Sequence, residues 1–192
     1  MLVPYSWLKE LVPLTEGPEE IAERLTLSGL EVEGVFNAYE DLAPARVVRV
    51  LAVAPHPQAE KLKVCQVSDG EREYQVVCGA PDVAEGLKAA FAPAGTILFT
   101  GEKVSEAQIR GVRSEGVLCS AYELGAGPDR SGLLKFEEDV PLGKPVIGVL
   151  GLEEPVLEVA ITPNRGDCLS IYGMAREVAA ITGAVVRPPV IP

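Results

Sequence analysis

The chain has 192 residues, of which 47% are hydrophobic and 23% charged, a composition typical of a globular protein with one or two domains. Its formal net charge of −11 argues against non-specific wrapping of nucleic acid, which depends on clustered lysine and arginine. No apolar run is long enough to span a bilayer, and the N-terminus lacks the basic start and apolar core of a signal peptide, so we expect a cytoplasmic protein without membrane contact.

The first segment is predicted to be helical. Pro18 stands at a first helical position, and Glu19 and Glu20 follow in the first turn, where the helix dipole favours anions. Gly29 is expected to end this helix. The alternation of residues 30–35 then predicts a short strand.

From about residue 39 the pattern changes to short strands with glycine or proline between them. The segments with this pattern are 45–56, 61–68, 71–81, 86–98 and 116–125. The Asp69-Gly70 pair is a strong hairpin signal between the second and third of them. Five short strands favour a small five-stranded barrel over a layered α/β fold.

The last part of the chain returns to a mixed pattern. Residues 156–163 alternate as a strand, and residues 164–183 predict a helix that Asp167 caps. In the turn before the helix, Asn164 favours the bend, and Arg165 is expected to pair with a nearby acid.

Neither end segment, at about 40 residues, is long enough to bury a core alone. We therefore predict an α+β domain built from residues 1–38 and 152–187 together. Residues 39–151 would form an all-β barrel inserted into that domain, and residues 188–192 a linker.

The only histidine, His56, precedes two of the four cysteines in a stretch that raises the question of a metal site. The cysteines are Cys65, Cys78, Cys119 and Cys168. None has the close paired spacing of a structural zinc site, and a cysteine within an alternating strand is usually a small apolar core residue. We predict four reduced, buried thiols and no metal.

Catalysis by this chain is not expected. A nucleophilic cysteine or serine would have to use His56 as its base, since there is no other histidine. The sequence has no phosphate-cradling glycine loop and no dinucleotide fingerprint. We therefore predict neither a catalytic residue nor a cofactor site.

Basic side chains gather instead in two stretches of the middle region: Lys61, Lys63, Lys103, Arg110 and Arg113. Lys61 and Lys63 are two residues apart, so on a strand they project from one face. Cations on a strand face and an adjoining loop can follow a phosphodiester backbone. Ordinary solvated surface charge is the alternative. Tyr74 and Tyr122 are the nearest candidates for stacking on bases.

Three stretches, "HPQAEKLKVCQVSDG", "VVCGAPDV" and "IRGVRSEGVLCSAYELG", closely resemble the tRNA-binding OB-fold module. That module occurs in bacterial phenylalanyl- and methionyl-tRNA synthetases and in small free-standing tRNA-binding proteins. The flanks "MLVPYSWLKELV", "LTLSGLEVEGV" and "LEVAITPNRGDCLSIYGMAREVAAITG" resemble the N-terminal domain of the bacterial phenylalanyl-tRNA synthetase β subunit, which carries the module as an insertion. The resemblance covers essentially the whole chain.

The resemblance implies a cytoplasmic α2β2 enzyme that attaches phenylalanine to tRNA-Phe with ATP and Mg²⁺. Catalysis would lie on the α subunit, and the editing and anticodon-contacting domains would lie further along the β subunit. This chain would then act as an auxiliary RNA-binding and assembly element. The alternatives are a scaffold that makes no RNA contact and a free-standing tRNA-binding protein, for which the flanks would be surplus.

Carried over to this sequence, the module's polar positions are His56, Lys61, Lys63, Arg110, Ser114, Glu115 and Ser120. The lysines and arginines, Arg113 included, are expected to contact phosphates. Ser114 and Ser120 are expected to hydrogen-bond the RNA backbone. His56 is expected to shape the entry loop.

Overall fold

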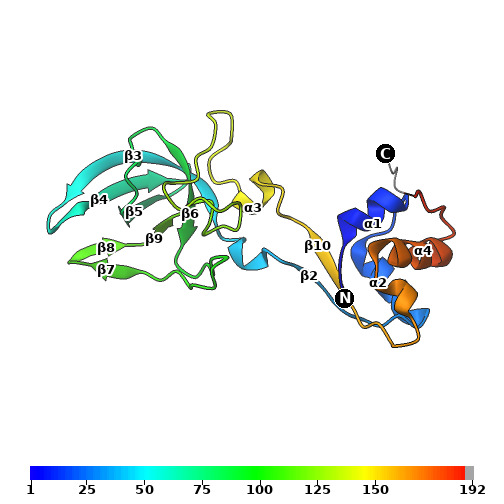
Figure 1. Cartoon of the computed structure of the whole chain (residues 1–192). Helices are drawn as coiled ribbons and strands as arrows, with labels where there is room; N and C mark the ends of the chain where they lie inside the picture. The colour runs from blue at the N-terminus through cyan, green and yellow to red at the C-terminus, as the bar shows by residue number, and fades with distance from the viewer. Residues whose placement is uncertain (189–192) are drawn as a thin grey trace. The chain divides into compact units, whose positions relative to one another are not determined.

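The computed structural model describes residues 1–188, and the chain folds into two compact units (Figure 1). Of the described residues, 1–38 and 153–188 form the end unit, and 39–152 form the middle unit. The predicted linker falls outside the described residues except for Pro188. No helix between residues 1 and 188 is long and apolar enough to cross a bilayer.

A three-stranded antiparallel sheet in the order β1-β10-β2 frames the end unit. Its strands are β1 (Leu2–Pro4), β2 (Val32–Asn37) and β10 (Pro155–Val159). The register places Leu157 of β10 between Val3 and Val35. Strands from the two ends of the chain therefore meet in one sheet.

The helices of the end unit are α1 (Tyr5–Leu11), α2 (Pro18–Leu27) and α4 (Ile171–Thr182). They bury one apolar cluster with the sheet, whose fully buried members include Val3, Leu8, Ile21, Leu25, Leu157, Met174 and Val178. Helices and strands each present one apolar face, and neither segment could bury that face without the other.

The sequence signals for the helix ends match the structure except at the start of α4. Pro18 opens α2, and Gly183 ends α4 in the left-handed conformation with φ of 74°. The cap of α4 is Ser170, whose Oγ accepts a hydrogen bond from the backbone N–H of Gly173 at 3.0 Å. The prediction of Asp167 as the cap is wrong, because Asp167 lies within a 3₁₀ turn, Gly166–Cys168, that ends before the helix begins.

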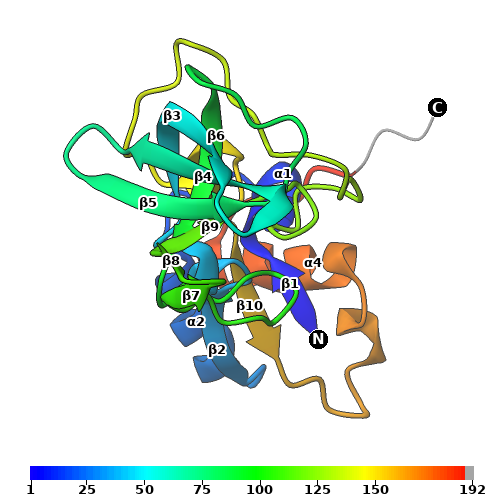
Figure 2. The same ribbon diagram turned by 90° about the vertical axis from the view of Figure 1, so that its left-hand side faces the viewer.

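The middle unit is built almost entirely of strands. These are β3 (Arg46–His56), β4 (Ala59–Ser68), β5 (Glu73–Cys78), β6 (Lys88–Pro93), β7 (Ala107–Ile109), β8 (Val112–Ser114) and β9 (Gly116–Leu118). A 3₁₀ turn, Glu40–Leu42, precedes them, and the short helix α3 (Val146–Val149) follows. Five strands form an antiparallel sheet in the order β5-β4-β3-β6-β9, while β7 and β8 form a separate hairpin (Figure 2).

Both faces of this sheet are covered at its centre, where β3 and β6 pair. Val48 and Phe91 pack with Tyr74 in the cluster on one face. Val47 and Ala90 belong to the cluster on the other. Alternate residues of a strand point to opposite faces, so two apolar neighbours such as Val47 and Val48 indicate a strand that is buried on both sides.

The Asp69-Gly70 pair forms the predicted hairpin between β4 and β5. Asp69 Oδ1 accepts hydrogen bonds from the backbone N–H groups of Glu71 at 3.0 Å and Arg72 at 2.8 Å. Its Oδ2 accepts from the hydroxyl of Tyr74 at 3.0 Å. Burial alone would raise the pKa of Asp69, but these hydrogen bonds hold the pKa below its ordinary value.

The sheet is open, so the predicted closed five-stranded barrel is not found. β5 and β9 are the outer strands, and within residues 1–188 no ladder joins them. Single contacts hold the edge of β5 instead: Ser114 Oγ accepts from the N–H of Val77 at 3.0 Å, and Glu115 Oε2 accepts from the N–H of Gln75 at 2.9 Å. The backbone N–H of Glu115 also donates to the carbonyl oxygen of Gln75 at 2.9 Å, so the residue before β9 is held to β5 without a continuous ladder.

Candidate nucleic-acid interface

His56 joins the two stretches of sequence that were singled out for RNA binding. Its ring is buried, and Nε2 lies 3.0 Å from the carbonyl oxygen of Ile109 at the end of β7. Its Nδ1 accepts a hydrogen bond from the backbone N–H of Gln58 at 3.1 Å. These partners require the neutral tautomer with the proton on Nε2. The loop after β3 is therefore tied to the β7–β8 hairpin.

Arg110 completes this junction from the hairpin side. Its Nη1 donates to the carbonyl oxygen of Gln58 at 3.0 Å. Arg110 and Gly111 form the two-residue connection between β7 and β8, with φ of 46° and 84°. Two positive φ angles are the requirement of a type I′ turn, and Arg110 is the only non-glycine residue with positive φ in the described part of the chain. A strained residue held in place this way marks a position of functional interest.

A surface hollow follows from this arrangement. It is lined by residues 55–62 together with Arg110. Lys61 is exposed here, and its ammonium group has no hydrogen-bond or ion-pair partner among residues 1–188. Arg110 is exposed as well. Lys61 and Arg110 thus place two cationic side chains on one hollow.

Lys63 and Lys103 do not share this place. The Nζ of Lys63 donates to the carbonyl oxygens of Pro81 at 3.3 Å and Val83 at 3.1 Å, so it ties the loop after β5 to β4. Lys103 is exposed, and its backbone bridges to Ile97 in the loop after β6. The five basic candidates therefore do not form one patch.

Arg113 lies among acids. Its Nη2 is 2.9 Å from Glu106 Oε2 and 3.5 Å from Glu115 Oε1. Arg72 pairs with the same oxygen of Glu115 at 3.2 Å. A phosphate that approached Arg113 would have to compete with these carboxylates.

The hydroxyl groups of Ser114 and Ser120 are engaged within the chain. Besides accepting from Val77, Ser114 Oγ donates to the carbonyl oxygen of Gly116 at 3.0 Å. Ser120 Oγ donates to Glu123 Oε2 at 2.6 Å and accepts from the N–H of Glu123 at 3.3 Å. Both serines are buried. The side chains stabilise the open edge of β5 and the turn after β9.

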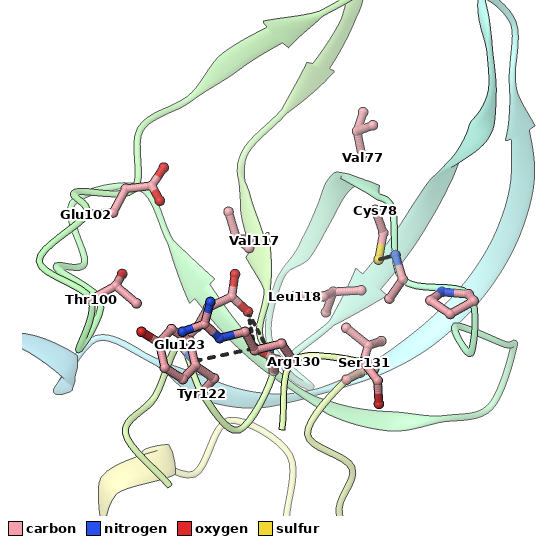
Figure 3. Close-up of a pocket in the computed structure, with 16 residues that line it drawn as sticks. Val77, Cys78, Thr100, Glu102, Val117, Leu118, Tyr122, Glu123, Arg130 and Ser131 are labelled. Atoms are coloured by element: carbon pink, nitrogen blue, oxygen red, sulfur yellow. Dashed lines mark hydrogen bonds between the residues drawn. The ribbon is translucent and has the colours of Figure 1, made fainter. Parts of the chain in front are cut away.

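The sequence reasoning missed a second hollow, of about 500 Å³, although it singled out two of the residues that line it, Ser120 and Tyr122, for RNA binding (Figure 3). The guanidinium carbon of Arg130 lies 3.5 Å from the centre of the Tyr122 ring. Glu102 and Glu123 also line this hollow. Arg130 stands in the turn-rich stretch "GAGPDRSG", where no periodic pattern predicts what a side chain contacts.

The four cysteines are buried free thiols. Burial raises the pKa of Cys65 to about 11, and it likewise raises the pKa values of Cys78, Cys119 and Cys168. Thiols with raised pKa values are poor nucleophiles at neutral pH. These sulfurs therefore behave as core atoms.

The end unit holds one cluster of chemically active groups, around Arg165. The guanidinium lies 3.1 Å from Asp167 Oδ2 and 2.7 Å from Glu177 Oε1, and these hydrogen bonds raise the pKa of Arg165. Asp167, Cys168 and Glu177 form the only group of three potential metal ligands among residues 1–188. Because Arg165 already neutralises the two carboxylates, the cluster is a structural ion pair. The turn before it runs through Asn164 and is closed by the bond from Arg165 N–H to the carbonyl of Thr162 at 2.9 Å.

Comparison with known proteins places these features in a family. The model of the family described as "Putative tRNA binding domain" matches residues 45–145. The phenylalanine–tRNA ligase beta subunit of Bordetella parapertussis is 46% identical in an alignment of 190 residues that covers 98% of this chain and 24% of that protein. That of Moorella thermoacetica is 47% identical in an alignment of 199 residues, gaps included, that likewise covers 98% of this chain and 24% of that protein. The chain thus spans about a quarter of the length of these relatives.

Among solved structures, a MetRS related protein from Pyrococcus horikoshii is similar over 53% of this chain and 87% of its own, at 23% identity and a TM-score of 0.41. That likeness is too slight to support an argument. The matched domain and the relatives that cover nearly the whole chain support one assignment. The chain belongs to the tRNA-binding domain family, within a region that it shares with phenylalanine–tRNA ligase beta subunits.

Proposed function

We propose that the chain is the N-terminal part of a phenylalanine–tRNA ligase β subunit and that its middle unit is an OB-type module that contacts RNA. The observation that supports this most is the junction at His56. It holds the loop after β3 against the β7–β8 hairpin, and it gathers Lys61 and Arg110 at one hollow. Exposed cations beside a strand edge favour phosphates over any neutral ligand.

The whole enzyme would be a cytoplasmic α2β2 heterotetramer that attaches phenylalanine to tRNA-Phe. ATP and Mg²⁺ would be bound by parts of the enzyme other than this chain. The end unit would be an assembly element for the α subunit and the rest of the β subunit. Through Lys61 and Arg110, the middle unit would add affinity for tRNA. These contacts would not read the tRNA sequence, since phosphate contacts carry no sequence information directly.

The competing proposal is a scaffold without RNA contact. It is supported by the apolar side chains that the end unit exposes, among them Trp7 at 54%, Leu27 at 81% and Leu169 at 66%. It is supported too by the acids around Arg113. In that case removal of cations at the hollow would leave tRNA affinity unchanged.

The test is the affinity of the 192-residue chain for tRNA-Phe across salt concentrations, with K61A and K144A as matched variants. Lys144 is also exposed, and it lies near the start of β3, because its carbonyl oxygen accepts a hydrogen bond from the N–H of Val47. Lys61 lies near the other end of β3, about 30 Å away along the strand. We expect K61A to weaken binding and to reduce the slope of log K against log salt by about 0.7 to 1. K144A should behave as the original chain. Equal affinity of both variants and the original chain at every salt concentration would reject the RNA contact proposed here.

A further inference from the structure

The hollow of Figure 3 lies in the open seam of the middle unit. Val77 and Cys78 from β5 and Val117 and Leu118 from β9 line it, and these are the two outer strands of the sheet. Its volume of about 500 Å³ falls in the range of small-molecule sites. The missing ladder between β5 and β9 therefore leaves a recess that can accept a group the size of a nucleobase.

A flat platform stands in this recess. The guanidinium of Arg130 lies over the ring of Tyr122, and the arginine is exposed to solvent. The backbone N–H of Tyr122 donates to the carbonyl of Asp129 at 3.1 Å. Asp129 Oδ1 in turn accepts from the N–H of Ser131 at 2.8 Å. The loop thus holds the stacked pair in place before any ligand arrives, and guanidinium planes are known platforms for unpaired bases.

The charges in the recess disfavour a phosphate. Two carboxylates, Glu102 and Glu123, line it against the one guanidinium of Arg130. Glu123 Oε2 already accepts from the N–H and the hydroxyl of Ser120, whereas the carboxylate of Glu102 is exposed and has no partner among the described residues. An ionised carboxylate only accepts hydrogen bonds, so its complement on a base is an N–H donor, and the exocyclic amino group of adenine or cytosine supplies two such hydrogens.

We propose that this recess binds one unpaired, amino-bearing base of an RNA, stacked on Arg130 and hydrogen-bonded to Glu102. The inference rests on the proposed function and adds a base contact to the phosphate contacts at Lys61 and Arg110. The two places are connected, because the chain between Arg110 and Val117 spans at most about 25 Å. β8 lies in this stretch beside β5, bonded through Ser114 to Val77.

The experiment measures binding of the 192-residue chain to fluorescein-labelled octamers of adenylate, cytidylate and uridylate. We expect the first two to bind at least about fivefold more tightly than the third, because uracil has no exocyclic amino group and offers only its single ring N–H. R130K keeps the charge but removes the plane, and E102Q replaces the acceptor-only group; each should reduce this preference to less than about twofold. K61A should weaken all three octamers alike, which separates the phosphate contacts from the base contact.

The outcomes distinguish the two proposals. Equal affinity for the three octamers, or an unchanged preference in R130K and E102Q at an unchanged unfolding midpoint, would overturn the base site. If K61A still weakens all three octamers, the proposed RNA contact stands. Absence of binding to every octamer and to tRNA would overturn both.

Discussion

At the scale of single residues, His56 has a structural role, because its ring holds two segments of the middle unit together by hydrogen bonds. Each ring nitrogen has one partner: Gln58 lies two residues away in the sequence, and Ile109, at the end of β7, lies 53 residues away. A histidine used in this way fixes its tautomer and its orientation. It gives the hollow at Lys61 a defined shape, although its own atoms are buried.

Substitution of His56 should therefore act on stability and RNA affinity together. We expect H56A to lower the free energy of unfolding by about 1–3 kcal/mol, because two hydrogen bonds of a buried ring are lost. Urea titration measures this change. Q58A is the matched control, since only backbone atoms of Gln58 take part in the junction. A stable H56A variant with unchanged RNA affinity would show that the junction does not organise the hollow.

Asp69 gives a prediction for the effect of pH. Folding lowers the pKa of its carboxyl group from the ordinary 3.8, so the ionised form stabilises the fold at pH values above that range. This contribution is lost as the pH falls through the lowered pKa. D69N keeps an acceptor for the two N–H groups but cannot accept equally from Arg46 and Tyr74.

We expect D69N to lower the free energy of unfolding at neutral pH by about 1–3 kcal/mol. We also expect it to lose stability less steeply than the original chain below about pH 4. Chemical denaturation at a series of pH values measures both effects. If the free energies of unfolding of D69N and the original chain changed in parallel from strongly acidic to neutral pH, the stabilising role of the ionised Asp69 would be contradicted.

At the scale of elements, the β7–β8 hairpin combines backbone strain with a cation. R110A removes the guanidinium but keeps a side chain at positive φ, whereas R110G removes both the guanidinium and the strain. We expect R110G to be more stable than R110A by about 1 kcal/mol, and both to weaken RNA binding to the same extent. Different RNA affinities for the two variants would mean that the backbone shape of the turn, rather than the cation, makes the contact.

The acids beside this hairpin should oppose RNA binding. Glu106 holds Arg113 at 2.9 Å, and both side chains are more than half exposed. E106Q should leave Arg113 paired with Glu115 alone, at 3.5 Å, and raise RNA affinity about two- to fivefold at low salt. The gain should vanish near 1 M salt, because salt screens the charges. E137Q makes the same change of charge at another exposed acid and is the control. An equal gain in both variants would indicate a general effect of net charge.

The sequence predicted local features well and long-range ones poorly. Proline and glycine indicated both ends of α2 and the end of α4, because these residues restrict or extend backbone angles locally. The open seam was not predictable, since it depends on Ser114 and Glu115 reaching β5 from 37 and 40 residues away. The pairing of Arg130 with Tyr122 likewise arises from a loop, where neither period 2 nor period 3.6 constrains a side chain.

At the scale of the whole molecule, the acidic balance and a role in RNA binding are compatible. Between residues 40 and 150 there are 12 Lys+Arg against 16 Asp+Glu, so most of the net charge of −11 lies outside the middle region. The electrostatic potential at a point on the protein surface depends mainly on the nearest charges, since salt screens charges that lie beyond about 8–10 Å. Lys61 and Arg110 can therefore attract a phosphate on an acidic protein, and the general acidity limits non-specific binding.

The most direct test of RNA contact at the Lys61 hollow is a crosslinking map of tRNA-Phe on the complete ligase that carries this chain. Photoreactive groups along the tRNA would be traced to peptides of the β subunit. We predict crosslinks within residues 55–62 and 107–114, lost at high salt. Crosslinks confined to other parts of the ligase, with none between residues 39 and 152, would contradict the proposed contact.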